Sequence, residues 1–315
     1  MFIRLRPRFA SAAILLIILL HFSILAQGDL IGDVRAQLAQ NSFSAAESEL
    51  NSYKSQHGIT PEYLEALSWM ARGAASMSQW VQATTYATET RTLCEQQLTK
   101  RKLDAEPHLP LALGAAYEVL AQSLDAKGQH AKAISLLRSA LARYGNTSIQ
   151  ARLKKNLNLL VLVGQPAPPL QEAQYLGPKP PTLASLKGSP VLLFFWAHWC
   201  VDCKAEVPVI VRLRQEFSRD GLVVIGPTQL YGYAAQGADA TPAAERAYIE
   251  SVRSRYYASL QDMPVPLSQQ NFNAYGASTT PTLVVLNRAG QVEMYHPGAL
   301  SYGELHAALE KAVSR

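Results

Sequence analysis

Two cysteines with two residues between them, Cys200 and Cys203, are the side chains of this sequence best suited to chemistry. Such a pair can cycle between a dithiol and a disulfide, or its thiolates can hold a metal ion such as zinc or copper. A zinc site needs further Cys or His ligands at matching spacing, and the sequence contains no second pair of this kind. We therefore interpret the pair as a redox dithiol. A copper chaperone that adds a histidine such as His296 is the binding-protein alternative.

A short strand and a helix are predicted on either side of the pair. Residues 191–196 form an almost unbroken apolar run, which is typical of a strand buried on both faces. After the cysteines, apolar residues recur at three- and four-residue intervals as far as Phe217 and make one face of a helix. The dithiol then lies at a helix N-terminus, where free N–H groups and the helix dipole favour a thiolate. Cys200 is the expected nucleophile, and Cys203 is the expected resolving thiol.

The residues around the dithiol extend this prediction. Residues 196–208 read W-A-H-W-C-V-D-C-K-A-E-V-P, which resembles the pattern W-A-x-W-C-x-x-C-x-x-E-x-P of extracytoplasmic thioredoxin-like disulfide reductases of the TlpA/ResA type. Further family-like segments flank it in order, namely Gly164–Pro168, Leu183–Gly188 and Thr280–Thr282. The resemblance covers about the C-terminal half of the chain. It implies an α/β thioredoxin-like fold with a central insertion and a thiol-disulfide oxidoreductase that needs no cofactor besides its own sulfurs.

The same resemblance implies where a substrate would bind. In thioredoxin-like folds a cis-proline loop lies beside the dithiol, and the backbone of the residue before the proline pairs with the substrate strand. The matching bond here is Thr280–Pro281, and the sequence alone would support only a turn residue at this proline. Trp199, next to the nucleophile, is the third expected substrate-binding position. The expected substrates are disulfides or thiols of client proteins, with an unidentified protein as electron donor.

A proton must move when the resolving thiol attacks, and Glu206 is the candidate that handles it. Thioredoxin uses a buried Asp on the strand before the motif, but the matching residue here is Phe194. Glu206 follows Cys203 by three residues and matches the acidic residue of the family pattern. The alternative is a salt-bridged or solvated carboxylate without a catalytic role. Asp202, between the cysteines, replaces the commoner Pro, and its charge favours a reductant over a strong oxidant.

Two other functions compete with disulfide exchange as interpretations of this sequence. A peroxiredoxin-like peroxidase needs a hydroxyl three residues before its reactive cysteine, and Ala197 occupies that position. A passive scaffold would have no need of an intact dithiol. Thiol-disulfide exchange therefore remains the leading hypothesis.

The change from helical to strand-like patterns places a domain boundary near Val163. Residues 163–181 are crowded with Pro and Gly, and we expect residues 163–315 to form the thioredoxin-like domain. The expected order is β-α-β-insertion-α-β-β-α. After the dithiol helix, the predicted elements are a strand at 222–225, a helix at 241–260 in the insertion, an edge strand at 263–267, a helix at 268–275, strands at 282–287 and 291–295, and a helix at 301–313.

Residues 30–162 are rich in Ala, Leu, Gln, Ser and Glu and are predicted to be helical. Similar segments recur at 41–46, 78–83 and 128–133, where a polar turn leads to a bulky residue and then to Ala, as in the turn of a tetratricopeptide (TPR) repeat. This TPR-like region is expected to bind a partner or to self-associate. A helical cap without a specific ligand is the alternative. Cys94 is predicted to be a buried small hydrophobe.

The N-terminus and the composition define the compartment. Arg4, Arg6 and Arg8 precede an apolar stretch at 9–26, which predicts a signal peptide over residues 1–26 or an uncleaved membrane anchor. Both place the remainder of the chain outside the cytoplasm, in the periplasm or secreted. The net charge of +5 is not concentrated in a long basic run, so nucleic-acid binding has little support.

Overall fold

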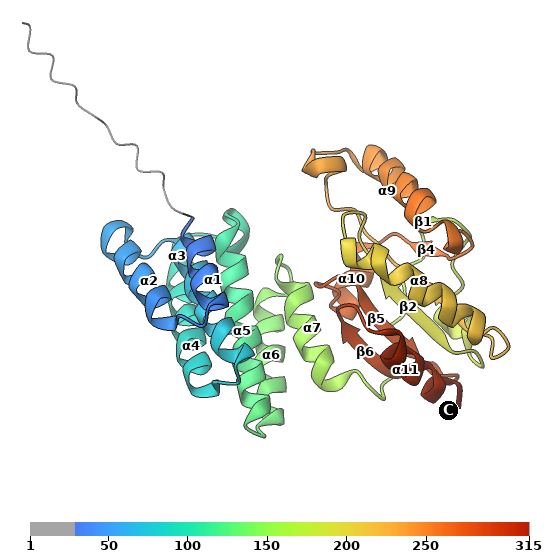
Figure 1. Cartoon of the computed structure of the whole chain (residues 1–315), viewed down its shortest axis with the longest axis horizontal. Coiled ribbons are helices and arrows are strands. Elements are labelled where there is room, and N and C mark those ends of the chain that lie inside the picture. The colour runs from blue at the N-terminus through green and yellow to red at the C-terminus, as the bar shows by residue number, and fades with distance from the viewer. Residues whose placement is uncertain (1–28, 315) are drawn as a thin grey trace, which may run out of the picture.

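The computed structural model describes residues 29–314, and the predicted export segment, residues 1–26, lies outside this range. The chain forms a helical half followed by a half built on a sheet (Figure 1). Across residues 29–314, every helix is too short or too polar to span a bilayer. The helical half contains α1 (Leu30–Ala39), α2 (Phe43–His57), α3 (Pro61–Ser76), α4 (Trp80–Gln97), the short η1 (Leu103–Ala105), α5 (His108–Ala126), α6 (His130–Tyr144) and α7 (Gln150–Val161).

The similar segments of the sequence are the turns of successive helical hairpins, α1–α2, α3–α4 and α5–α6. Asn41, Ser78 and Gly128 occupy the same place in each turn, and all adopt a positive φ, of 57°, 57° and 71°. The next residue in each turn donates its N–H to a carbonyl five residues earlier in the preceding helix, which closes the helix end with the same hydrogen bond each time. The repeat in the sequence therefore corresponds to a repeat in the backbone.

Small residues let these hairpins pack closely. Ala46, Ala83 and Ala133, one in the second helix of each hairpin, have no exposed surface. The first helices follow one another in space, because α1 contacts α3, α3 contacts α5, and α5 contacts α7. Cys94 on α4 is fully buried in this core, which confirms its predicted burial, and burial raises the pKa of its thiol to about 12.

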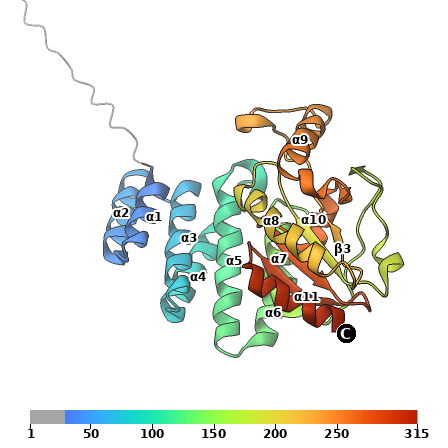
Figure 2. The same ribbon diagram turned by 45° about the vertical axis from the view of Figure 1, so that its right-hand side comes forward.

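The second half has the predicted order of strands and helices (Figures 1 and 2). Its main sheet has the strand order β3-β2-β5-β6, in which β3 is parallel to β2 and the other pairs are antiparallel. Its elements are β1 (Tyr175–Leu176), η2 (Leu183–Leu186), β2 (Val191–Phe195), α8 (Val201–Glu216), β3 (Val223–Ile225), η3 (Ala235–Gly237), α9 (Pro242–Tyr256), η4 (Ala258–Leu260), β4 (Val265–Pro266), α10 (Gln269–Tyr275), β5 (Thr282–Leu286), β6 (Val292–Pro297) and α11 (Tyr302–Ser314).

The central strand β2 is buried on both faces, as its unbroken apolar run predicts. Leu192 and Phe194 point into a core shared with α8, α9 and α11. Leu193 and Phe195 point into the other core, which includes α10 and residues from the end of the helical half. The sheet is therefore sandwiched between two helical layers, as an α/β fold requires.

The short edge strand predicted at 263–267 is present as β4, which lies outside the main sheet. Strand β4 pairs with β1 in a separate two-stranded sheet, and the sequence did not predict β1. The carbonyls of Pro264 and Pro266 accept hydrogen bonds from the N–H groups of Gly226 and Thr228 beyond β3. A proline has no N–H to donate in return, and the reverse hydrogen bond comes from Ser268, whose N–H donates to the carbonyl of Thr228 at 2.9 Å.

Helix α7 connects the two halves. It packs against α10 and β6, and Asn158 donates its side-chain N–H to the carbonyl of Tyr275 at 2.9 Å. Gly276 follows with a φ of 63°, and a Cβ at this position would lie 2.2 Å from the backbone nitrogen of Lys155. Glycine is therefore required where α7 approaches the sheet domain. The last helix before the boundary predicted near Val163 contributes to both halves.

Candidate active site

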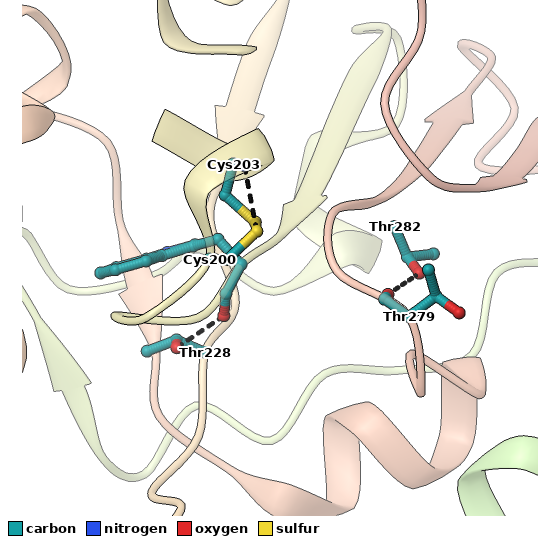
Figure 3. The surroundings of a disulfide bond; sticks show 6 residues. Cys200, Cys203, Thr228, Thr279 and Thr282 are labelled. Atoms are coloured by element: carbon teal, nitrogen blue, oxygen red, sulfur yellow. Dashed lines mark hydrogen bonds between the residues drawn. A yellow bond between two sulfur atoms is a disulfide. The ribbon is translucent and has the colours of Figure 1, made fainter. Parts of the chain in front are cut away.

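The two cysteines form a disulfide where β2 leads into α8 (Figure 3). Cys200 is the N-cap residue of α8, and its Sγ accepts the backbone N–H of Cys203 at 3.0 Å. A hydrogen bond to sulfur at a helix N-terminus favours the thiolate over the thiol in the reduced protein. The structure thus places the dithiol where the sequence predicts it.

The surroundings of the sulfurs are asymmetric. Cys200 retains 3% of its surface, whereas Cys203 is fully buried. Trp199 and Val201 on either side of Cys200 are large apolar residues that are well exposed. An incoming disulfide would therefore meet Cys200 first, within an apolar rim formed by these two side chains.

The loop before β5 lies at the same end of the sheet as the dithiol. Strands β2 and β5 are antiparallel, and Phe195 at the end of β2 lies opposite Thr282 at the start of β5. The segment that leads from β2 to the cysteines and the loop that leads into β5 therefore lie at the same end of the sheet. The Thr280–Pro281 bond in this loop is cis, as the resemblance implies. Thr282 donates its hydroxyl to the carbonyl of Thr279 at 2.6 Å and braces the loop, and Figure 3 shows both threonines on the loop that faces the disulfide.

Trp196 anchors the segment that carries the cysteines. Its indole N–H donates to the carbonyl of Gly226 at 2.9 Å, and its own carbonyl accepts the hydroxyl of Thr228 at 2.8 Å. The ring is fully buried and packs against Tyr257. The residue after β2 is therefore hydrogen-bonded to the segment after β3, which fixes the position of the turn that leads into α8.

Glu206 lies one turn after Cys203 on α8 and is only 4% exposed. Burial raises the pKa of its carboxyl, the charge of Asp202 raises it further, and a hydrogen bond from the backbone of Leu300 opposes both. One carboxyl oxygen is buried without a hydrogen-bond partner among the described residues. This carboxyl is therefore neither salt-bridged nor freely solvated, and it can hold a proton at a pH where an exposed Glu cannot.

A second buried group beside the motif escaped the sequence analysis. His198, between Ala197 and Trp199, is almost fully buried, and its Nε2 lies 3.3 Å from Oε1 of Glu245 on α9. The rings of Tyr231, Tyr233 and Tyr248 lie edge-on around the imidazole at 5.3–5.6 Å. Burial lowers the pKa of His198, and Glu245 partly offsets this.

Glu245 also organises the insertion itself. Its carboxylate accepts the backbone N–H groups of Tyr231 and Gly232 at 2.5 and 2.8 Å. The central insertion is thus attached to the residue two positions before the nucleophile. The sequence signal was the His at the variable position of the motif, but its acidic partner lies on a different helix and could not be identified from spacing.

His296, the third ligand considered for a metal site, lies on β6 in register with Leu283. Within residues 29–314, there is no cluster of three or more His, Cys, Asp or Glu side chains arranged to hold a metal ion. The copper chaperone alternative gains no third ligand from this part of the chain.

Comparison with known proteins finds similarity in the half of the chain that carries the dithiol. Residues 163–229 match the model of the AhpC/TSA family. Over 148 residues the chain is 27% identical to the thioredoxin-like protein YneN of Bacillus subtilis, covering 47% of this chain and 78% of that protein. It is 27% identical over 160 residues to the thiol-disulfide oxidoreductase ResA of Oceanobacillus iheyensis, covering 49% and 75%.

Among solved structures, a thiol:disulfide interchange protein of the thioredoxin family from Chlorobium tepidum TLS aligns with a TM-score of 0.34 and 21% identity. That alignment covers 47% of this chain and 96% of the other. The alignments with YneN, with ResA and with this solved structure each cover about half of this chain.

Proposed function

We propose that this chain, whose C-terminal half belongs to the TlpA/ResA type of thioredoxin-like thiol-disulfide oxidoreductases, reduces disulfide bonds of client proteins outside the cytoplasm. The observation that carries the proposal is the position of Cys200 as the N-cap of α8, with its sulfur accepting a backbone N–H and its resolving partner buried one turn further in. The predicted export segment supports the compartment.

The exchange proceeds in two steps that transfer two electrons. The thiolate of Cys200 attacks one sulfur of the client disulfide, which forms a mixed disulfide and releases the other client sulfur as a thiolate. Cys203 then loses its proton and attacks Cys200, which breaks the mixed disulfide and releases the second client thiolate. The client is reduced, and the enzyme holds the Cys200–Cys203 disulfide that the structure contains. A dithiol protein as electron donor restores the reduced enzyme by the reverse exchange.

Glu206 takes the proton of Cys203 in the second step of this proposal. Its place one turn after Cys203 and its raised pKa suit a carboxyl that exchanges a proton with a buried thiol. Phe194 leaves no acid on β2 to do so, because it is buried among apolar residues. Glu206 is therefore the acid that remains available.

The client binds at Trp199, Thr280 and Pro281 in this proposal. Trp199 is 47% exposed beside the nucleophile, and the cis-proline loop begins at the same end of the sheet. The backbone of Thr280 would pair with the client strand that carries the disulfide, as the family resemblance implies. The repeated hairpins of residues 30–162, which we interpret as TPR-like, would bring the client or a second copy of the chain to this site.

Trapping of a mixed disulfide tests the assignment. In a Cys203→Ala protein the resolving step is blocked, so we expect clients to accumulate in a mixed disulfide with Cys200. Dithiothreitol should reduce this disulfide and release the client. Cys200→Ser should form no such complex and should lose insulin reduction. Cys94→Ala should retain the activity, because the Cys94 thiol is buried on α4 in the core of the helical half. Mass spectrometry of the trapped complexes identifies both the client and the nucleophile.

A redox titration checks the direction of the exchange. We expect a potential near that of thioredoxin, about −270 mV, because the charge of Asp202 beside the cysteines disfavours a very low thiolate pKa. A potential near about −120 mV, as in DsbA, would show that the protein oxidises its clients.

A further inference from the structure

A cleft of about 700 Å³ lies between the helical half and the loop that leads to the cis-proline. Its walls come from α3, from the segment between η1 and α5, from the start of α7, and from Ser278 and Thr279. Thr279 is followed directly by the Thr280–Pro281 pair. A ligand in this cleft would therefore lie beside the loop that faces the disulfide, on which Figure 3 labels Thr279.

Cationic side chains run along the helices that contribute to this cleft. Arg72 on α3, together with Arg152 and Lys155 on α7, line it. The row continues beyond the cleft, since the guanidinium groups of Arg72 and Arg35 on α1 lie over the ring of Trp69 at 4.3 and 4.5 Å. Helices α1 and α3 are the first helices of successive hairpins and α7 follows the last hairpin, so the row follows the direction in which the hairpins are stacked.

The acidic groups nearby leave part of this row without a hydrogen-bond acceptor. Glu118 on α5 accepts hydrogen bonds from Arg152 Nε at 3.1 Å and Lys155 Nζ at 2.8 Å, and these cations hold its pKa well below the usual range. One carboxylate therefore serves two cations. Arg72 has neither a salt bridge nor a side-chain hydrogen bond to any residue from 29 to 314. Nη2 of Arg152 is buried, and no residue of the described chain accepts its N–H.

The two acidic residues that line the cleft are engaged elsewhere. Asp104 accepts hydrogen bonds from the backbone N–H and the hydroxyl of Ser148. Glu106 accepts the backbone N–H groups of His108 and Leu109 at the start of α5. Both carboxylates thus accept backbone N–H groups at chain turns. Burial lowers the pKa of Arg72 and the charge of Arg152 lowers it further, while the charges of Glu118 and Glu65 oppose this shift. A partly buried guanidinium without an acceptor is costly, and an incoming carboxylate would relieve that cost.

We infer that this cleft binds an acidic segment of the client polypeptide and so positions the client disulfide beside Cys200. The inference rests on the proposed function, since it names the client chemistry for the same site. Carboxylates suit the site because the guanidinium of Arg72 lines the cleft beside Arg152 and has no hydrogen-bond acceptor among residues 29–314. An extended segment matches better than a single small anion, because the cations continue from α7 past the cleft to Arg35 on α1.

Peptide reduction by the full chain tests this inference. The probes are two disulfide-bonded peptides of equal length, one with Asp and Glu on the N-terminal side of its disulfide and one with Asn and Gln there. We expect the wild-type protein to prefer the acidic peptide about tenfold in kcat/KM, mainly through KM, and the preference should fall as salt is added. Arg72→Glu should abolish the preference, so that the two peptides are reduced with equal kcat/KM.

A matched control separates the cleft from overall charge. Arg138→Glu makes the same charge reversal on α6, at an exposed position that does not line the cleft, and it should retain the full preference. Equal rates for the two peptides in the wild-type protein would overturn the inference, and so would an equal loss of preference in both variants. Wild-type binding to vesicles of anionic phospholipid, lost in Arg72→Glu and without any peptide preference, would assign the cleft to a membrane surface instead.

A small uncharged disulfide distinguishes this failure from failure of the proposed function. Reduction of bis(2-hydroxyethyl) disulfide requires the dithiol and not the cleft. If the wild-type protein reduces it but shows no peptide preference, the cleft assignment alone is wrong. If the reduced protein does not react with it, the oxidoreductase proposal is wrong, and anisotropy of a labelled acidic peptide without cysteine then decides the cleft assignment, with weaker binding to Arg72→Glu expected.

Discussion

The two halves of the described chain are stabilised in different ways. In the helical half each hairpin packs on the next, so most contacts join segments that follow one another in the sequence. In the sheet domain, β2 pairs with β5, and segments far apart in the sequence meet at the same sheet end. The reactive dithiol lies in the second half, where segments distant in the sequence meet beside the cysteines. The first half presents an extended surface formed by its stacked hairpins.

Helix α7 shows where this division ends. By sequence it is the last helix of the helical half, but it packs against α10 and β6 and donates a hydrogen bond from Asn158 to Tyr275. Leu162, just after α7, belongs to the core below the sheet. The contrast between the halves is therefore one of architecture, and the two share a core at their junction.

The largest effect should come from separating the halves within this junction. A fragment of residues 164–315 should fold and retain dithiol chemistry, as its own apolar pattern predicts. It should be less stable than a fragment of residues 148–315 by about 4 kcal/mol, because it loses the apolar contacts of Leu162 and α7 and the hydrogen bond to Tyr275. Urea denaturation of both fragments measures the difference.

The full-length Asn158→Ala protein isolates one part of this loss. It should be destabilised by about 1–2 kcal/mol, because a buried carbonyl loses its donor. Equal stability of the two fragments would show that α7 belongs to the helical half alone.

A smaller effect is expected within the chemical half, at Glu206. Replacement of this residue by Gln should slow the resolving step by about thirtyfold, because the proton of Cys203 loses its acceptor, while the first attack by Cys200 keeps its rate. The pH dependence of the resolving step should also change, since the carboxyl with the raised pKa is gone. Rapid-mixing kinetics of the mixed disulfide measure the two steps separately.

Glu216→Gln, at the far end of the same helix, is the control and should leave both steps unchanged. An unchanged pH profile in Glu206→Gln would assign that residue a structural role.

The smallest effect concerns His198 and the attachment of the insertion. Burial lowers the pKa of His198 below its ordinary value of 6.5, so between the two values the unfolded state binds more protons than the folded state. This contribution to stability is present above pH 6.5 and is lost as the pH falls toward the lowered pKa. Each unit of pKa depression corresponds to about 1.4 kcal/mol.

We therefore expect His198→Gln to lose less stability than the wild-type protein between pH 7 and pH 5, as measured by denaturation at each pH. Parallel curves for the two proteins would show that the imidazole titrates as it does in the unfolded chain.

Much of the fold could be predicted because its signals are local. The apolar run of β2, the helical spacing after Cys203 and the short helix predicted at 268–275 each depend on signals within a few residues, and the structure confirms all three. The pairing of β4 with β1 was missed because it depends on which strand edge remains free in space. A two-residue strand such as β1 also carries too little pattern to be recognised.

The sequence by itself determined the chemistry. Two cysteines separated by two residues at the start of a helix lie close together through local backbone geometry alone, so the dithiol is placed at the helix N-terminus. It also determined the repeat of the hairpins, whose turns are closed by hydrogen bonds within a few residues. Tertiary structure alone decided that His198 meets Glu245, that α7 lies on the sheet domain, and that Arg72 shares a cleft with Thr279. Each of these contacts joins side chains from separate elements, and their proximity depends on how whole layers pack, which no local spacing encodes.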